Sequence, residues 1–435
     1  MLEVQGYNIY RQRGNEMIEP MNMKGKYTDA RIYATIADEA TLKQVQAIID
    51  DPIADGMDVC LMPDTHAGNI GPIGLVMSYR NKDGLERISP ALVGVDIACG
   101  MLCIDLGKIE IDYSLLDDVI RNHVPSGQNV SDIPSYPHDK IEKLCSYRSL
   151  KDVDWILRSC GTLGGGNHFI EIDESDEGNK YLVIHTGSRN LGKQVAEYHQ
   201  RIAVDAGNRQ DVEYGKRKRD VIAGCKAEGR TADIEKELIS LKEYCKEFNR
   251  NPDVIPYLEG ADLERYLHDV EICTEFSKAN RKMIAFRILE GLGIVSTYDD
   301  MKKLSMMETL HNYIDTDQKV IRKGAIRLKK GENAIIPLSM NEGALLVTGK
   351  GVDEYLQSGP HGAGRILSRT EAKERISMDE YRKSMEGIWS SSISESTIDE
   401  SPFSYKKLKD IEPMLDDTCT IDEHIRPVYN FKAQS

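Results

Sequence analysis

The sequence lacks the features of membrane and secreted proteins. It has no run of about 18 apolar residues, so it predicts no membrane-spanning helix. Its N-terminal segment, MLEVQGYNIYRQRGNEM, has no apolar stretch of the kind that a signal peptide needs. The nine cysteines follow no repeating spacing, which argues against a disulfide framework. We therefore expect a cytoplasmic protein in a reducing environment.

Positive charge is also scarce. Lysine and arginine number 56 against 71 aspartates and glutamates, which gives a formal net charge of −15. This balance argues against a protein that coats nucleic acid through phosphate contacts, although it leaves room for a local basic groove. No internal repeat is present. The 435 residues could form one large core or two or three domains.

The central part of the chain predicts a β-hairpin. Two apolar runs, His168–Ile172 and Tyr181–His185, flank the polar segment DESDEGNK. If residues whose numbers sum to about 353 face one another, His168 and His185 meet at the open end of the hairpin, roughly 5 Å apart. Two imidazoles at this separation can share a metal ion. Glycines 164–166, just before them, would let the backbone approach a ligand closely.

An aspartate and a cysteine lie inside the apolar run ALVGVDIACGMLCIDL, residues 91–106. A lone buried carboxylate is prohibitively costly, so Asp96 must be paired, hydrogen-bonded or metal-bound. One interpretation is that Asp96 caps a turn beside Gly94 and that Cys99 is an ordinary core residue. The other is that both residues are metal ligands.

Several of the ten histidines lie at predicted strand ends beside small or amide residues, where ligands protrude from a rigid scaffold. These are His168, His185, His311 and His361. With the thiol and carboxylate of the apolar run, they form a mixed set that suits zinc, manganese or cobalt better than magnesium or calcium. A shared thiolate makes a two-metal site plausible. His66 follows a Pro-Asp-Thr turn and could support the ligands from behind.

His361 stands between Pro360 and Gly362, in a loop that is predicted to open a helix. Backbone amides and a helix N-terminus in this arrangement can hold an anion.

The helical part of the chain includes one highly charged region. Residues 209–250 predict a helical hairpin that projects from the body, either as an RNA-contacting arm or as a solvated surface. Apolar residues at helical spacing predict a helix over Asp38–Asp50 and a long helix over Asp262–Leu289.

Seven motifs in a fixed order resemble the RNA-splicing ligase RtcB family. They are GVDIACGM, GTLGGGNHFIEI, HTGSRNLG, HN, RKGA, HGAGR and the tail DESPFSYK…RPVYNFK, and the resemblance extends from about residue 25 to residue 432. It implies a GTP- and manganese-dependent ligase of RNA repair or tRNA splicing. Such an enzyme joins an RNA 3′-phosphate or 2′,3′-cyclic phosphate end to a 5′-hydroxyl end through a guanylylated histidine and an RNA-ppG intermediate.

The resemblance also implies a fold and an organisation. We expect an α+β protein with mixed β-sheets in a central sandwich-like core and helices around it. Residues 1–435 would form one catalytic domain, with the charged helical insertion at residues 205–250. We expect a monomer whose partner is RNA, without a membrane.

By position in these motifs, the resemblance implies two Mn²⁺ ions, with Cys99 shared between them, held by Asp96, Cys99, His168, His185 and His311. It implies that His361 becomes guanylylated. The implied GTP pocket comprises Asn167, His168, Phe169, Ile170, Glu171, His311, Asn312, Pro337, Leu338, Ser339, Met340, Ala344, His361, Gly362, Ala363, Gly364, Tyr405 and Lys432. Arg189, in GSRN beside His185, has a planar fork that is well suited to an RNA phosphate.

The chain departs from the family pattern at several positions near these motifs, which are Ala98, Ile321, Leu338, Asn341, Ala344 and Ala433. Family members usually carry glycine where this chain has Ala98, and histidine where it has Ile321. None of these departures removes an implied metal ligand or the histidine nucleophile.

Two other functions use parts of the same residue set. A two-metal phosphoesterase would use the cluster to activate water, but it has no use for a histidine nucleophile in a glycine-rich loop. A non-catalytic RNA-binding scaffold would not need every type of ligand. The Lys-x-Asp-Gly motif of ligases that activate a 5′-phosphate is absent from the sequence.

Overall fold

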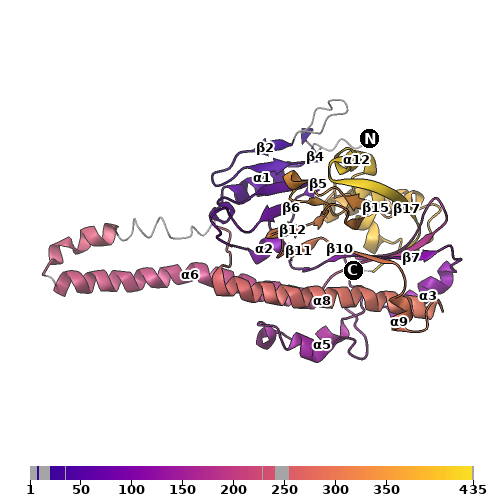
Figure 1. Cartoon of the computed structure of the whole chain (residues 1–435), viewed down its shortest axis with the longest axis horizontal. Helices are drawn as coiled ribbons and strands as arrows, with labels where there is room; N and C mark the ends of the chain where they lie inside the picture. The colour runs from indigo at the N-terminus through magenta and orange to yellow at the C-terminus, as the bar shows by residue number, and fades with distance from the viewer. Residues whose placement is uncertain (1–6, 9–19, 35, 228, 241–253, 434–435) are drawn as a thin grey trace.

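The chain builds two large β-sheets and a pair of long helices (Figure 1). The computed structural model describes residues 7–8, 20–34, 36–227, 229–240 and 254–433. The mixture of sheets and helices confirms the predicted α+β class.

The first sheet has six strands in the order β11-β12-β6-β5-β3-β2. All neighbours pair antiparallel except β3 and β5, which are parallel. The central strands β5 and β6 are buried at nearly every position, because packed elements cover both faces of the sheet there. The strands are β2 (Met21–Met23), β3 (Ala30–Ile32), β5 (Val59–His66), β6 (Ile73–Ser78), β11 (Asn312–Asp315) and β12 (Val320–Lys323).

The second sheet has seven antiparallel strands in the order β10-β7-β9-β8-β17-β15-β14. Its edge strands β10 and β14 lie in contact, and the Ile335 amide donates to Oγ1 of Thr309 at 3.1 Å. The sheet therefore curls until it is almost closed. Its strands are β7 (Gly100–Gly107), β8 (Phe169–Glu174), β9 (Lys180–Thr186), β10 (Met306–Leu310), β14 (Asn333–Pro337), β15 (Ala344–Gly349) and β17 (Cys419–Lys432).

Strands β8 and β9 form the predicted hairpin, with a register one residue away from the expected one. Phe169, not His168, pairs with His185, so paired numbers sum to 354 rather than 353. His168 lies in the turn before β8, where Gly166 has a φ of +73°. The alternation of apolar and polar residues does not show at which residue such a turn ends and the strand begins. It therefore leaves the strand register uncertain by one residue.

Two long helices run beside the sheets: α6 (Arg189–Ala227) and α8 (Gly260–Gly291). The second confirms the long helix expected over Asp262–Leu289. Helix α6 continues without a break past residue 205 and projects from the body as an arm (Figure 1). A 3₁₀ turn (Thr231–Asp233) and helical residues to 240 follow, and residues 241–253 of the expected hairpin lie outside the described part. No described helix has the length and apolarity needed to cross a membrane.

Shorter elements complete the structure. Helix α1, expected over Asp38–Asp50, begins after the cap Asp38, whose side chain accepts from the Thr41 amide. Small strand pairs are β1 (Tyr7–Asn8) with β4 (Ile36–Ala37) and β13 (Ala325–Arg327) with β16 (Ser358–Pro360). The remaining α-helices are α1 (Glu39–Ile49), α2 (Pro90–Val93), α3 (Tyr113–His123), α4 (His138–Ile141), α5 (Val153–Arg158), α9 (Tyr298–Met301), α10 (Arg369–Arg375), α11 (Met378–Ser384) and α12 (Leu408–Thr418).

Candidate active site

The five predicted metal ligands gather at one end of the seven-stranded sheet. Strands β10, β7, β9 and β8 are consecutive neighbours, and Gly100 at the start of β7 pairs with Thr186 of β9 and Leu310 of β10. Residues beside these three positions therefore converge from separate parts of the chain. They are Asp96 and Cys99 before β7, His168 before β8, His185 near the end of β9, and His311 between β10 and β11.

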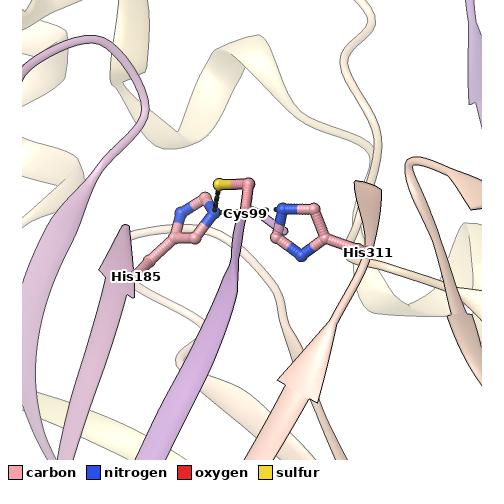
Figure 2. A group of neighbouring side chains, drawn as sticks. All are labelled: Cys99, His185 and His311. Atoms are coloured by element: carbon pink, nitrogen blue, oxygen red, sulfur yellow. Dashed lines mark hydrogen bonds between the residues drawn. The ribbon is translucent and has the colours of Figure 1, made fainter. Parts of the chain in front are cut away.

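The ligand atoms form two groups of three that share Cys99. Its Sγ lies 3.6 Å from Nε2 of His168 and 3.3 Å from Nε2 of His185. Nε2 of His168 is 3.0 Å from Oδ2 of Asp96, and the Nε2 atoms of His185 and His311 are 3.3 Å apart. Figure 2 shows the side chains of Cys99, His185 and His311 pointing toward one another from three segments. This is the arrangement expected around two ions with a bridging thiolate.

The imidazole rings are oriented from behind by backbone carbonyls. Nδ1 of His168 lies 2.9 Å from the Leu163 carbonyl, and Nδ1 of His185 lies 3.2 Å from the Asn167 carbonyl. An Nδ1–H that donates to a carbonyl leaves the Nε2 lone pair free for a metal. Burial, together with the neighbouring imidazoles, lowers the pKa of His185 and His311 well below the usual value. Both rings are therefore neutral, as metal ligation requires.

The cluster contains negative or electron-rich atoms that a divalent cation would satisfy. Oδ1 of Asp96 is buried without a hydrogen-bond partner among the described residues. Burial, and then the nearby Asp96 carboxylate, raises the pKa of the Cys99 thiol well above its usual value. A bound cation would reverse this effect, because a coordinating thiol loses its proton. The set of one thiolate, one carboxylate and three imidazoles fits manganese, zinc or cobalt.

Helix α8 holds the ligand-bearing turns together through two fully buried side chains that the sequence did not reveal. Arg281 donates from Nη1 to the carbonyls of Ala98, at 3.1 Å, and Thr186, at 2.8 Å. Asn280 accepts from the amides of residues 161 and 162, at 2.7 and 2.9 Å, and donates to the Gly187 carbonyl, at 3.1 Å. The turn that carries Cys99 is therefore tied to the turn that follows His185.

His361 lies across the cavity from this cluster, directly after β16, and its ring centroid is 5.1 Å from that of His311. Nδ1 of His361 lies 2.5 Å from Oδ2 of the buried Asp64, and the same oxygen accepts from the His361 amide at 3.0 Å. At this separation the carboxylate would favour a proton on Nδ1 and leave the Nε2 lone pair free. Asp64 was not predicted, although a carboxylate in the apolar segment before His66 carried the same signal as Asp96.

The surroundings of Asp64 are tightly built. Nζ of the buried Lys406 donates to the carbonyls of Pro63, at 3.0 Å, and Thr65, at 3.1 Å. A Cβ at Gly364 would lie 2.2 Å from the Asp64 carbonyl oxygen, so only glycine fits there. His66, expected as a supporting residue, lines the cavity, and burial lowers its pKa to about 4.

The expected helix at His361 begins later than predicted. Helix α10 begins at Arg369, and its cap Ser368 forms a capping box with Glu371. A helix N-terminus is therefore not available beside His361. The loop from residue 362 to residue 367 intervenes because β16 ends in a Pro-His-Gly turn that cannot continue directly as a helix.

A cavity of about 390 Å³ connects the metal cluster to His361. Most of the predicted nucleotide and metal residues line it: Asp96, Cys99, Asn167, Phe169, Glu171, His185, His311, Asn312, Pro337, Leu338, Ser339, Met340, His361, Gly362, Ala363, Gly364, Tyr405 and Lys432. These residues come from both large sheets and from the loops between them.

A few predicted residues lie elsewhere. Ile170 points into the core on the other face of β8, because side chains alternate along a strand and Phe169 and Glu171 take the cavity face. Ala344 packs in a buried apolar cluster behind the cavity wall. His168 belongs to the metal cluster but lies behind the wall, and Arg189 lines a separate cavity.

The part of the cavity around Lys432 and Tyr405 holds a network of charges. Nζ of Lys432 lies 2.8 Å from Oε2 of Glu400, and the Tyr405 hydroxyl donates to the same oxygen at 2.6 Å. Burial alone would raise the pKa of Glu400, but Lys432 and the arginines 369 and 365 lower it to about 2. Burial raises the pKa of Glu171 to about 7, against the hydrogen bond from Asn430. Glu400 and the two arginines were not assigned roles from the sequence, although Glu400 and Arg365 lie within quoted motifs.

The departures from the family pattern are accommodated locally. Oδ1 of Asn341 accepts from the Ser339 hydroxyl at 2.8 Å, and its Nδ2 donates to the Ser384 carbonyl at 3.2 Å. Ile321 is buried in the core of the six-stranded sheet. Ala98 adopts a left-handed backbone with a φ of +57°. The remaining departures, Leu338, Ala344 and Ala433, are buried in apolar clusters.

Gly164, in the glycine-rich segment before His168, packs its backbone against a side chain. A Cβ at Gly164 would lie 1.7 Å from Nη1 of Arg189. The close approach therefore brings the backbone against this guanidinium, which also donates from Nε to Oγ1 of Thr162 and from Nη2 to the Gly127 carbonyl, both at 3.2 Å.

Fold and site together define an α+β protein with a candidate two-metal centre in the wall of a polar cavity. The chain belongs to the RtcB family. The family model, described as tRNA-splicing ligase RtcB, matches residues 44–157 and 145–433.

Curated relatives are similar over most of their length. The RNA-splicing ligase RtcB of Escherichia coli (strain K12) is 27% identical over 409 residues, which cover 86% of this chain and 90% of the relative. The tRNA-splicing ligase RtcB of Aeropyrum pernix is 27% identical, with 80% and 81% covered. The tRNA-splicing ligase RtcB of Thermococcus kodakarensis is 25% identical, with 90% of both chains covered.

Proposed function

We propose that this chain is an RNA ligase that uses GTP and two Mn²⁺ ions to join an RNA 3′-phosphate or 2′,3′-cyclic phosphate end to a 5′-hydroxyl end. The names of the family model and of the relatives support an RNA ligase of splicing or repair. The observation that best supports guanylylation of a histidine is the position of His361. Its ring lies beside that of His311 in the cavity, and its Nδ1 contacts Asp64.

The metal ligands divide naturally between the two ions. Asp96, Cys99 and His168 would hold one, and Cys99, His185 and His311 the other. When bound, such ions neutralise charge that develops on phosphoryl oxygens.

His361 would supply the covalent step. Its Nε2 attacks the α-phosphorus of GTP, and pyrophosphate leaves. The guanylyl group then passes to the RNA 3′-phosphate, and attack by the 5′-hydroxyl joins the strands and releases GMP. A 2′,3′-cyclic end must first be opened by water. The Asp64 carboxylate favours the reactive tautomer and offsets the positive charge that the ring acquires during attack.

The part of the cavity around Lys432 and Tyr405 suits a guanine base. A guanine edge presents donors at N1 and N2 beside an acceptor at O6. Glu171 of β8 pairs with Asn430 of β17, and Lys432 lies two residues further along β17. Glu171 and Lys432 both line the cavity and offer an acceptor and a donor. Tyr405 adds an aromatic wall. Ionised Glu171 would therefore select guanine over adenine, because adenine has no amino group at C2 and presents an acceptor at N1 where guanine presents a donor.

The test uses two pairs of labelled RNA strands with GTP and Mn²⁺. One pair carries 3′-phosphate and 5′-hydroxyl ends, and the other carries 3′-hydroxyl and 5′-phosphate ends. We expect joining of the first pair only, and an intact-mass gain of one guanylate on the protein in the absence of RNA. His361→Ala should abolish both, whereas His123→Ala, a change at an exposed histidine of α3, should abolish neither. Release of inorganic phosphate without joining would favour the two-metal phosphoesterase.

A further inference from the structure

A second cavity, of about 500 Å³, lies on another side of the metal cluster. It is bounded by the turn before Asp96, the loop at residue 127, helix α5 and the start of α6. Asp96 lines both cavities, so the second cavity reaches the candidate metal centre without passing through the proposed nucleotide site.

Two cationic side chains line this cavity at the start of α6. They belong to Lys193 and to Arg189, the first residue of α6, whose backbone is left-handed with a φ of +57°. The groups that hold Arg189 by hydrogen bonds, the Thr162 hydroxyl and the Gly127 carbonyl, are neutral, and the Asp96 carboxylate is its charged neighbour in the cavity. Lys193 is 60% exposed and has only a loose contact of 3.9 Å with Glu197. In a chain of net charge −15, these cations mark a local site for anions.

An aromatic side chain completes the cavity. Trp155 of α5 is partly exposed and lines the same space as Arg189 and Lys193. A tryptophan beside two cations offers a stacking surface for a base and partners for phosphates, the combination that single-stranded nucleic acid uses.

We propose that this second cavity binds the RNA strand that bears the terminal phosphate. The terminal phosphate lies beside Asp96 and Arg189, the preceding phosphate beside Lys193, and a base near the end stacks on Trp155. The inference rests on the proposed function, because it supplies the strand that the ligase acts on. It adds that RNA and nucleotide reach the metal centre through different openings.

Tryptophan fluorescence tests binding without any ligation. The chain has two tryptophans, and Trp389→Phe leaves Trp155 as the only one. Phenylalanine should preserve the stacking of residue 389 on Tyr429, where the ring centroids are 5.3 Å apart. We expect a short single-stranded RNA with a 3′-phosphate to quench Trp155, and the same RNA with a 3′-hydroxyl to bind at least about 10-fold more weakly. Absence of quenching by either RNA, or equal affinity for both, overturns the proposal.

Variants of Trp155 distinguish a role in stacking on an RNA base from a role in packing within the protein. Trp155→Leu keeps an apolar side chain and should raise the KM for RNA about 10-fold, whereas Trp155→Phe should restore most of the affinity. Lys193→Ala should weaken binding about 3- to 10-fold and reduce its salt dependence by about one charge. Equal affinity in the leucine and phenylalanine variants, with unchanged melting temperatures, would overturn the role of Trp155. If the chain binds the phosphate-ended RNA but joins no ends, the proposed ligation fails while this binding site stands.

Discussion

Oδ2 of Asp64 contacts His361 twice, through the ring nitrogen Nδ1 at 2.5 Å and through the backbone amide at 3.0 Å. One carboxylate oxygen thus sets both the orientation of the ring and the path of the loop that carries it. Asp64 is fully buried in β5, a central strand of the six-stranded sheet, so the histidine is held by a rigid element.

Asp64→Asn should slow guanylylation of His361 by at least about 100-fold, because an amide no longer favours the proton on Nδ1. Single-turnover labelling with GTP measures the rate. The matched control is Asp269→Asn, which alters another buried aspartate–histidine pair, with His199 at 2.9 Å, away from both cavities. The control should lose stability but label at a near-normal rate in the folded fraction. Similar rates in both variants would refute the role of Asp64.

Cys99→Ser should weaken metal binding at least about 10-fold, because the thiolate belongs to both groups of ligands. Metal content after dialysis, measured by elemental analysis, checks this expectation. Cys103→Ser changes a second buried cysteine on β7 that lies outside the cluster, and it should retain its metal. Full metal content in the Cys99 variant would mean that Cys99 is only a core residue.

GTP affinity should rise with pH through about 7, because burial raises the pKa of Glu171 to that value and guanine needs the ionised carboxylate. Below pH 7 the affinity should fall by about 10-fold per pH unit. Titration with a fluorescent GTP analogue measures the effect. Glu171→Gln should bind weakly with little dependence on pH in this range, and parallel profiles for the two proteins would contradict the assignment.

The same shift predicts an opposite trend in stability. A carboxyl whose folded pKa is raised stabilises the fold fully below its unfolded pKa of about 4.5, and this contribution is lost as pH rises through about 7. Without GTP, the free energy of unfolding should therefore decrease relative to that of Glu171→Gln between pH 5 and pH 8. Urea titrations of both proteins at the two pH values test the sign.

Ala98→Gly should change the free energy of unfolding by less than about 0.5 kcal/mol. Relief of the left-handed backbone, about 1–2 kcal/mol, is offset by loss of a buried methyl group, about 0.8 kcal/mol, and by the flexibility of glycine, about 0.4–1 kcal/mol. The control Ala285→Gly, in the buried face of α8, should cost roughly 1.5–2 kcal/mol. Equal losses in urea unfolding would show that Ala98 is not strained.

The sequence predicts those parts of the site that leave a local signal. Asp96 stood out because a carboxylate interrupts an apolar run, and His168 and His185 because they bracket a hairpin. The α+β class is implied by the resemblance of the motifs to the RtcB family. The one-residue register error and the late start of α10 arose at turns, where backbone reversal is decided by a few dihedral angles rather than by periodicity.

The residues that hold the site together leave no such signal. Asn280 and Arg281 read as ordinary positions in a long amphipathic helix, yet they hold the turns before Cys99 and after His185 from far along the chain. Lys406 likewise supports Asp64 only because β5 and the loop before α12 meet in three dimensions. These contacts depend on how elements pack, which no short window of sequence contains.

Strand β17 has a consequence for the order in which the enzyme matures during translation. It lies between β8 and β15 and carries Lys432, yet the ribosome makes it after both neighbours. Until it emerges, β8 and β15 each expose an unpaired edge, and the nucleotide end of the cavity lacks a wall. The metal ligands, all at or before residue 311, are complete much earlier. Under the proposed function, a nascent chain would therefore bind metal before it can bind GTP, and it would not act on RNA ends near the ribosome that is making it.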